Sequence, residues 1–265
     1  MKTRYPKEFL YSLATLLGAT IVIHAIWQAW VRPNAQAVLA VQYESMRKDP
    51  NYVPDRSLFV IMKDWEQESC AILMIWAVGM IVFKSRATRR EQEILDGDPV
   101  RVPEGMRILP EDTREYVRQL EALPTEPQQS LVVRASKAAL ARFGATRNVQ
   151  DVSEAGHAVC AAEAERLDSE LSMIRYIAWA IPAIGFIGTV RGIGDALAEA
   201  HKAVTGDISG VTEGLGVAFN STLVALLLSL VLMFLLHNLQ LAQERLVLDA
   251  ETYLDNRLLR NLQVR

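Results

Sequence analysis

Three hydroxyl side chains stand among small residues in two apolar stretches of the sequence, and they are its best candidates for chemistry. Thr189 lies within PAIGFIGTVRGIG, and Ser221 and Thr222 lie within VAFNSTLVALLLSL. Inside a membrane, a hydroxyl either donates to a carbonyl of its own helix or offers a hydrogen bond to a polar group that enters the bilayer. Both possibilities stay open, and together with Asn220 these residues are candidates for lining a narrow polar path for ions.

Small residues recur at helical spacing around the hydroxyls. Gly185, Gly188 and Gly192 fall at i, i+3 and i+7, and Ala218 and Ala225 share one face of the second stretch. Lipid provides no hydrophobic drive for helix association, so small faces serve close packing between membrane helices. We predict that these five positions pack helices together, either for that purpose alone or as the slim wall of a narrow polar path.

Titratable groups are scarce in the apolar stretches. Arg191, Asp195 and Glu213 fall near one end of them, where we expect charges at the mouth of a pore. Arg191 is expected to extend to the surface or to pair with Asp195, four residues on. His24 has no partner in its own segment and is expected to be a packed or interfacial histidine. No Asp or Glu lies deep in an apolar stretch, so a proton path needs a carboxylate from another chain.

Four apolar segments must position these residues, at 9–31, 70–83, 174–197 and 217–236. A helix needs about 20 apolar residues to cross a bilayer, so the second segment is short and the others are long enough. We predict an all-α integral membrane protein with four transmembrane helices. The third and fourth helices are expected to extend beyond the membrane, because no helix breaker separates them from the neighbouring polar sequence.

Lysine and arginine counts predict how the chain crosses the membrane, because cytoplasmic loops are enriched in both. Residues 84–173 hold 13 of them and residues 198–216 hold only Lys202. Both termini are therefore placed inside, although residues 32–69 hold five. The predicted regions are an N-terminal membrane region with two spans (1–83), a cytoplasmic helical region (84–173), a pore-forming helix pair (174–237) and a cytoplasmic C-terminal helix (238–265).

The composition of the 265-residue chain argues against several classes of function. It is 51% hydrophobic and 22% charged, with a net charge of −3. No basic run is interleaved with aromatic residues, so a nucleic-acid partner is not expected. No zinc-type spacing, nucleophile–base arrangement or phosphate-binding loop appears, so we expect neither an enzyme nor a metal or other cofactor. Cys70 and Cys160 fall in different predicted compartments, which argues against a disulfide.

PAIGFIGTVRGI and GVTEGLGVAFNSTLVALLLSL resemble, in this order, the two pore helices of the MotA/TolQ/ExbB proton-channel family. The resemblance implies a homopentamer in the bacterial inner membrane, in which the last two spans surround two helices of a single-span partner similar to TolR, ExbD or MotB. Each partner helix carries an aspartate that takes up and releases protons or sodium ions, and this ion flow drives mechanical work. By the same resemblance, Thr189 is the pore threonine of the first helix, and Ser221 and Thr222 occupy the hydroxyl positions of the second. Asn220 stands where some relatives carry an acid.

Other features leave the role of such a unit open. Residues 84–173 contain no recognisable rotor-contact region, and we interpret Arg89, Arg90, Arg114 and Arg118 as a solvated helix face. The alternative function is a non-conducting oligomeric membrane scaffold that anchors a cytoplasmic complex. A motor of this kind is equally consistent with protein transport or import at the outer membrane, envelope maintenance, gliding, flagellar rotation and defence against phage.

Overall fold

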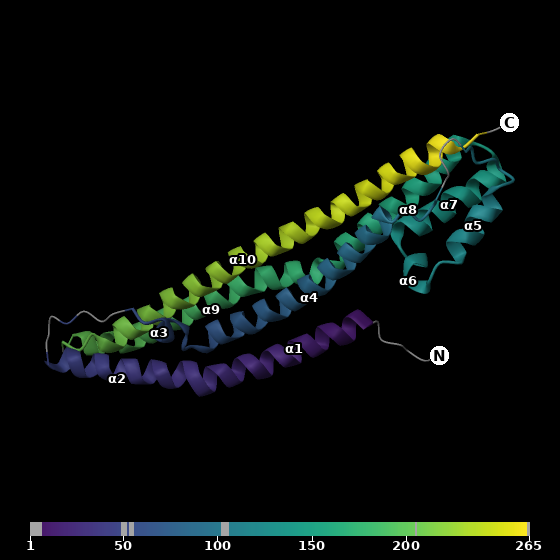
Figure 1. The fold of residues 1–265 in the computed structure, drawn as a ribbon. Coiled ribbons are helices and arrows are strands. Elements are labelled where there is room, and N and C mark those ends of the chain that lie inside the picture. Colours follow the sequence, from purple (N-terminus) through teal and green to yellow (C-terminus); the bar gives the residue numbers. More distant parts are fainter. Residues whose placement is uncertain (1–6, 49–51, 53–55, 102–105, 205, 264–265) are drawn as a thin grey trace, which may run out of the picture. The chain divides into compact units, whose positions relative to one another are not determined.

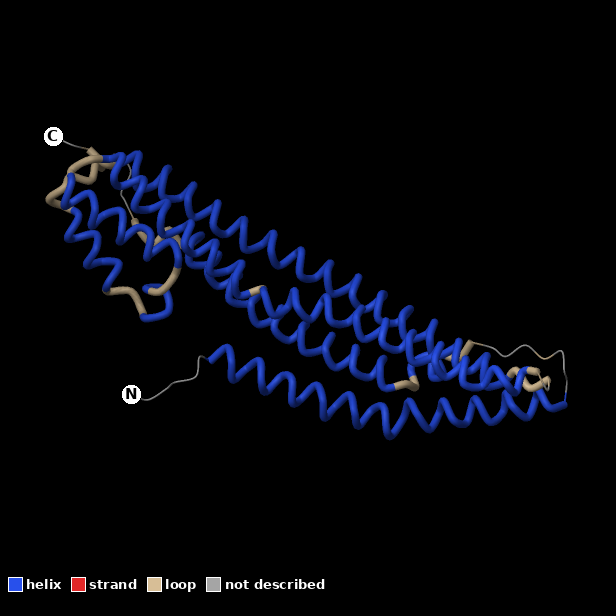
Figure 2. The backbone as a smooth tube through the Cα atoms, turned by 180° about the vertical axis from the view of Figure 1, so that it is seen from behind, coloured by secondary structure: helices blue, strands red, loops and turns tan. Residues whose placement is uncertain are grey.

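The computed structural model describes residues 7–48, 52, 56–101, 106–204 and 206–263, and most of them are helical (Figure 1). Within these ranges the only β-type pairing is an isolated parallel bridge between Ile108 and Leu262. The prediction of an all-α chain is confirmed (Figure 2). The chain divides into two compact units: unit 1 contains residues 1–81 and 173–236, and unit 2 contains residues 82–172 and 237–265.

Unit 1 is built from long helices and one short one. Its elements are α1 (Lys7–Ile26), the π-helical turn η1 (Trp27–Val31), α2 (Arg32–Lys48), α3 (Leu58–Met62), and the parts within this unit of α4 (Trp65–Asp96), α9 (Ser172–Ala203) and α10 (Ser209–Tyr253). α1 runs through η1 into α2 without a break. α9 and α10 lie side by side in both views (Figures 1 and 2).

Within the described residues, four helical stretches are long and apolar enough to cross a membrane: Phe9–Lys48, Trp65–Asp96, Val149–Ala203 and Ser209–Asn261. They contain the four predicted segments. The second segment looks short in the sequence because only residues 70–83 are continuously apolar, whereas α4 has 32 residues. Glu66 and Glu68 in its first turn interrupt the apolar run but not the helix, since glutamate is a good helix former and is favoured near a helix N-terminus.

The third predicted helix contains one irregularity and one internal proline. α8 (Val149–Glu170) and α9 are separated by a single turn residue, Leu171. Pro182 lies inside α9 without ending it, although proline lacks the N–H that would bond to the carbonyl four residues earlier. That carbonyl belongs to Ala178, and it accepts a hydrogen bond from the hydroxyl of Ser229 on α10 at 3.1 Å. The proline is therefore tolerated because a neighbouring helix supplies the missing donor.

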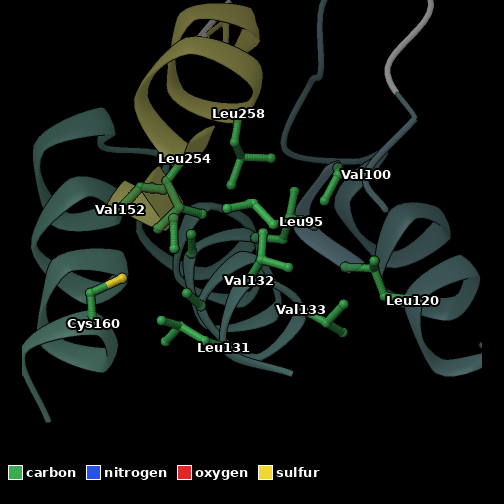
Figure 3. Packing of buried hydrophobic residues seen from close by; sticks show 14 of the residues in the cluster. Leu95, Val100, Leu120, Leu131, Val132, Val133, Val152, Cys160, Leu254 and Leu258 are labelled. Atoms are coloured by element: carbon green, nitrogen blue, oxygen red, sulfur yellow. The ribbon is translucent and has the colours of Figure 1, made fainter. Parts of the chain in front are cut away.

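Unit 2 is a smaller helical unit with its own apolar core. Besides its parts of α4 and α10 it contains α5 (Thr113–Glu121), α6 (Thr125–Gln128), α7 (Leu131–Thr146), α8, the π-helical turn η2 (Leu254–Leu258) and the 3-10 turn η3 (Leu259–Asn261). Figure 3 shows side chains from α4, α7 and the C-terminal turns, among them Leu95, Val132, Leu254 and Leu258, meeting in this core. The removal of these groups from water stabilises the unit.

α7 contains a glycine near its end. Gly144 has the appearance of a C-cap glycine, but the helix continues to Thr146, and Arg147 takes the left-handed conformation with a φ of 55°. Gly144 instead serves a close approach between helices: a Cβ there would lie 2.7 Å from the Thr113 hydroxyl on α5. The segment 96–105, which is rich in glycine and proline, lies partly outside the described residues.

Candidate functional site

α9 and α10 pack against each other along their small faces, and we call this contact the seam. A Cβ on Gly192 would lie 2.5 Å from the backbone nitrogen of Ala218. A Cβ on Gly185 would collide with the Ala225 side chain, and Gly188 is equally closed. The small faces of the two helices therefore meet within one chain, and the missing side chains allow the two backbones to approach closely.

The three predicted hydroxyls converge on two backbone carbonyls at the seam. Thr189 Oγ1 lies 3.3 Å from the carbonyl oxygen of Gly185 in its own helix and 3.2 Å from that of Ala218 in α10. Thr222 Oγ1 lies 3.2 Å and 3.3 Å from the same two oxygens. Ser221 Oγ contacts them at 3.3 Å and 3.0 Å. Thr189 and Thr222 are also hydrogen-bonded to each other, so the hydroxyls bond both within their own helices and across the seam.

The seam has a covered side and an open side. α4 covers Gly188, because a Cβ there would lie 3.1 Å from the Glu66 side chain, and Ser221 at the same level is only 1% exposed. Thr189 follows Gly188, and Thr222 follows Ser221. Each threonine side chain is therefore turned by about 100° around its helix axis from the residue before it. Both are half-buried. The two threonines, which we call the threonine pair, therefore lie toward the side that α4 leaves open.

Large apolar side chains flank the threonine pair. Phe186 and Ile193 lie about one turn on either side of the first threonine, and Phe219 and Leu226 lie about one turn on either side of the second. All four are exposed, with exposed fractions of 65%, 44%, 72% and 55% respectively. An exposed apolar surface of this kind marks a contact with lipid or with another protein. The threonine pair is thus a polar spot on an apolar face of α9 and α10.

Asn220 lies apart from the threonine pair. It lines a cavity of about 720 Å³ together with residues of α2, α3 and the first turns of α10, including Tyr43 and Glu213, and with Lys63 and Asp64, which lie between α3 and α4. Glu213 accepts a hydrogen bond from the Tyr43 hydroxyl at 3.2 Å and lies 3.9 Å from Lys63 Nζ. The structure thus brings Asn220 and Glu213 to the same cavity, and this cavity is not lined by the three hydroxyl residues of the seam.

Arg191 is held by a carboxylate that the sequence pattern did not indicate. Its Nε lies 2.7 Å from Glu66 Oε1, and its Nη2 lies 3.0 Å from Glu66 Oε2. Glu66 is 0% exposed. The predicted partner Asp195 is more distant at 3.6 Å, and Asp64 lies at 3.8 Å. Glu66 lies outside the predicted segment because it precedes the continuous apolar run of α4. A predicted helix that began one turn earlier would have included it.

A second buried carboxylate, Glu68, connects α4 to the N-terminal helix. Its Oε1 lies 2.6 Å from His24 Nδ1, and its Oε2 lies 2.7 Å from Arg32 Nη2. His24 and Arg32 are eight residues apart, which in a regular α-helix places them about 80° apart around the axis. The intervening π-helical turn η1 has more residues per turn and reduces this angle. His24 therefore finds in α4 the partner that its own segment lacks.

Unit 2 has a separate charge network around Glu163. Glu163 Oε2 lies 2.6 Å from Arg134 Nη2 and 3.1 Å from Arg166 Nε. Burial alone would raise the pKa of Glu163, but hydrogen bonds from the two guanidinium groups outweigh it and hold the pKa below its ordinary value. Within the part of the chain that the structure describes, no group of three or more His, Cys, Asp or Glu side chains is arranged to hold a metal ion.

Comparison with known proteins supports the predicted family resemblance. Residues 128–252 match the family model described as the MotA/TolQ/ExbB proton channel family. The matched segment contains α9 and all but the last residue of α10, so it includes the whole seam. No curated protein and no solved structure matches the chain. The threonine pair lies inside the matched segment, and the match confirms the predicted resemblance of this part of the chain to the MotA/TolQ/ExbB proton channel family.

Proposed function

We propose that this protein is the channel subunit of an ion-driven motor in the bacterial inner membrane, and that five copies surround two helices of a single-span partner. The threonine pair is the observation that supports this most directly. The threonine pair places hydroxyl groups on an apolar face of α9 and α10 that the chain itself leaves uncovered. It does so in a segment that matches a proton-channel family. Such a face suits partner helices that are apolar apart from one deep carboxyl group.

The threonine pair provides hydrogen bonds where an ion-carrying carboxyl group would need them. Moving a carboxyl group into an apolar setting without a hydrogen-bond partner costs several kcal/mol. A threonine hydroxyl can turn from the carbonyls of Gly185 and Ala218, donate to a carboxylate, and accept from the protonated acid. The pair therefore lowers the free energy of a partner aspartate in both protonation states, at the level where it takes up or releases a proton or a sodium ion.

Five equivalent threonine pairs would give the partner helices five equivalent positions. Between them the wall is made of large apolar side chains such as Phe186 and Leu223. A neutral acid crosses such a surface at lower cost than a carboxylate does. Protonation from outside would free the aspartate from one pair, and release of the proton inside would fix it at the next. Ion flow is thereby coupled to rotation of one component within the other.

The glycines and alanines of the seam have a different role here from the slim pore wall that the sequence suggested. They hold α9 and α10 close enough for the two threonine hydroxyls to bond to each other. The wall that faces the partner is then formed by the larger residues on the open side. α1 is assigned to the lipid-facing periphery, because its apolar residues Leu13, Leu17 and Ile21 are 44%, 55% and 69% exposed.

Imaging of the purified complex tests this proposal. The chain is co-expressed with a single-span protein that carries a membrane aspartate, purified in detergent and imaged by electron microscopy. We expect five copies of this chain around two foreign helices, with Phe186 and Phe219 turned toward those helices. A ring with an empty or lipid-filled centre, or with these phenylalanines on its outer surface, would contradict the proposal and favour a non-conducting scaffold.

A further inference from the structure

Arg191 places a positive charge close to the threonine pair in sequence and on the same helix. It follows Thr189 by two residues, so the two side chains leave α9 on nearly opposite sides. Its side chain is 35% exposed and is not locked in place by burial. An arginine side chain is long and flexible and can lie along a helix surface. Its contacts therefore decide on which side of α9 its charge resides.

Glu66 supplies the contacts that hold Arg191 on the α4 side. The contact is made at two points, with distances of 2.7 Å and 3.0 Å, which fixes the plane of the guanidinium as well as its position. Asp64 and Asp195 lie at 3.8 Å and 3.6 Å and add attraction without this geometry. Lys63 lies 3.3 Å from Asp64 and partly compensates that carboxylate. Glu66 is thus the main restraint on Arg191.

We propose that Glu66 is a positioning residue that keeps the Arg191 charge away from the threonine pair. This inference rests on the proposed channel function. A released guanidinium near the threonines would form a two-point pair with the partner's aspartate and hold it in its charged form. It would also repel protons or sodium ions that approach the same place. The ion pair between Glu66 and Arg191 prevents both effects without contacting the ion itself.

Glu68 offers a matched control for Glu66 in the same turn of α4. Its side chain is also buried, at 8% exposed, and it also makes short contacts with basic side chains. Its partners, however, are His24 and Arg32 of the N-terminal helix, and not a residue of α9. A general effect of removing a buried carboxylate from α4 would therefore appear in both variants, whereas an effect through Arg191 is confined to Glu66.

The experiment compares ion flux through vesicles that contain the complex with its partner. Wild type, Glu66→Gln, Glu68→Gln and the double variant Glu66→Gln/Arg191→Gln are reconstituted at equal amounts, and assembly is checked by co-purification of the partner. We expect Glu66→Gln to lower the flux by about tenfold or more, on the scale of the charge effects that steer ions to a site. Glu68→Gln should stay within about twofold of wild type, and the double variant should recover most of the lost flux because the released charge is gone.

Each outcome separates this inference from the proposed function. Wild-type complex that carries no flux contradicts the channel function, and the inference falls with it. If wild type conducts and Glu66→Gln conducts equally well, the contact between Glu66 and Arg191 has no effect on ion flux, and the positioning role is wrong. If the double variant stays as low as Glu66→Gln, one of the two charges takes part in conduction and the positioning role is wrong. Should Glu66→Gln fail to assemble, the double variant, which removes both charges of the Glu66–Arg191 pair, decides: flux near wild type supports the positioning role, and a loss of about tenfold or more contradicts it.

Discussion

The hydroxyl of Ser229 on α10 donates a hydrogen bond to the carbonyl oxygen of Ala178 on α9, at a distance of 3.1 Å. Ala178 is the residue whose helical donor is removed by Pro182, four residues later. In a membrane no water is at hand to replace that donor, and an unpaired carbonyl costs free energy. The small-residue face of α10 therefore contains a serine with a defined structural task, separate from the threonine pair.

Ser229→Ala is expected to destabilise the seam by about 1–2 kcal/mol, because it leaves a buried carbonyl without a donor. Unfolding of the detergent-solubilised protein in a graded series of denaturing detergent measures this loss. Thr20→Ala is the matched control, since the Thr20 hydroxyl is exposed and bonds only to the Leu16 carbonyl of its own helix, at 2.9 Å. The control should unfold like wild type. Equal unfolding of Ser229→Ala and wild type would mean that the Ala178 carbonyl is satisfied in another way.

Gly192→Ala is expected to destabilise the contact between α9 and α10 by about 1–3 kcal/mol, the usual range for overpacking. The added methyl group would lie 2.5 Å from the Ala218 backbone nitrogen, so the helices have to separate. Gly194→Ala serves as the control two residues later on the same helix, where no described atom of another helix lies within 4 Å of the new methyl group. It should be neutral or stabilising by up to about 1 kcal/mol, since alanine favours the helix more than glycine does.

The same unfolding assay measures both glycine variants. The predicted order of stability is Gly194→Ala at or above wild type, and Gly192→Ala below it. The close packing of the seam would be refuted if Gly192→Ala were as stable as Gly194→Ala.

Unit 2 is expected to lose stability in acid through Glu163. The pKa of this carboxyl is below its ordinary value in the folded protein, because hydrogen bonds from Arg166 and Arg134 outweigh the effect of burial. A lowered folded pKa contributes stability above the unfolded pKa, near 4.5, and this contribution is lost as the pH falls through the folded pKa. Glu163→Gln should therefore be less stable than wild type at pH 7, and the difference should shrink at pH 3.

The pH dependence is measured by chemical unfolding of both proteins, followed by a probe attached in unit 2. Glu165→Gln is a useful comparison, because Glu165 is exposed on the same helix, and its stability should follow that of wild type at every pH. A difference between wild type and Glu163→Gln that stays constant from pH 7 to pH 3 would rule out the predicted link.

Helices were the easier part to predict, because apolar runs of about 20 residues in lipid have few alternatives to an α-helix. α10 and the apolar part of α9 follow from this rule. It was harder to predict which surface each helix packs against. The stripe of Gly185, Gly188 and Gly192 predicts a close contact, but its spacing does not say whether the contact is with α10 or with a partner. Pairing between distant segments has no local signal, so neither the bond between Thr189 and Thr222 nor that between Glu66 and Arg191 could be derived from spacing.

The most direct test of the channel function is ion flux in vesicles that contain the complex of this chain with its partner, measured for wild type and for Thr189→Val/Thr222→Val. Valine keeps the shape of threonine, so the seam should stay intact while its hydroxyls are lost. Since a hydrogen bond to a charged group contributes about 1.5–3 kcal/mol, we predict a fall in flux of about 10- to 100-fold. Thr20→Val should conduct like wild type. A double variant that assembles with its partner and conducts at the wild-type rate would contradict a role for the threonine pair in the ion path.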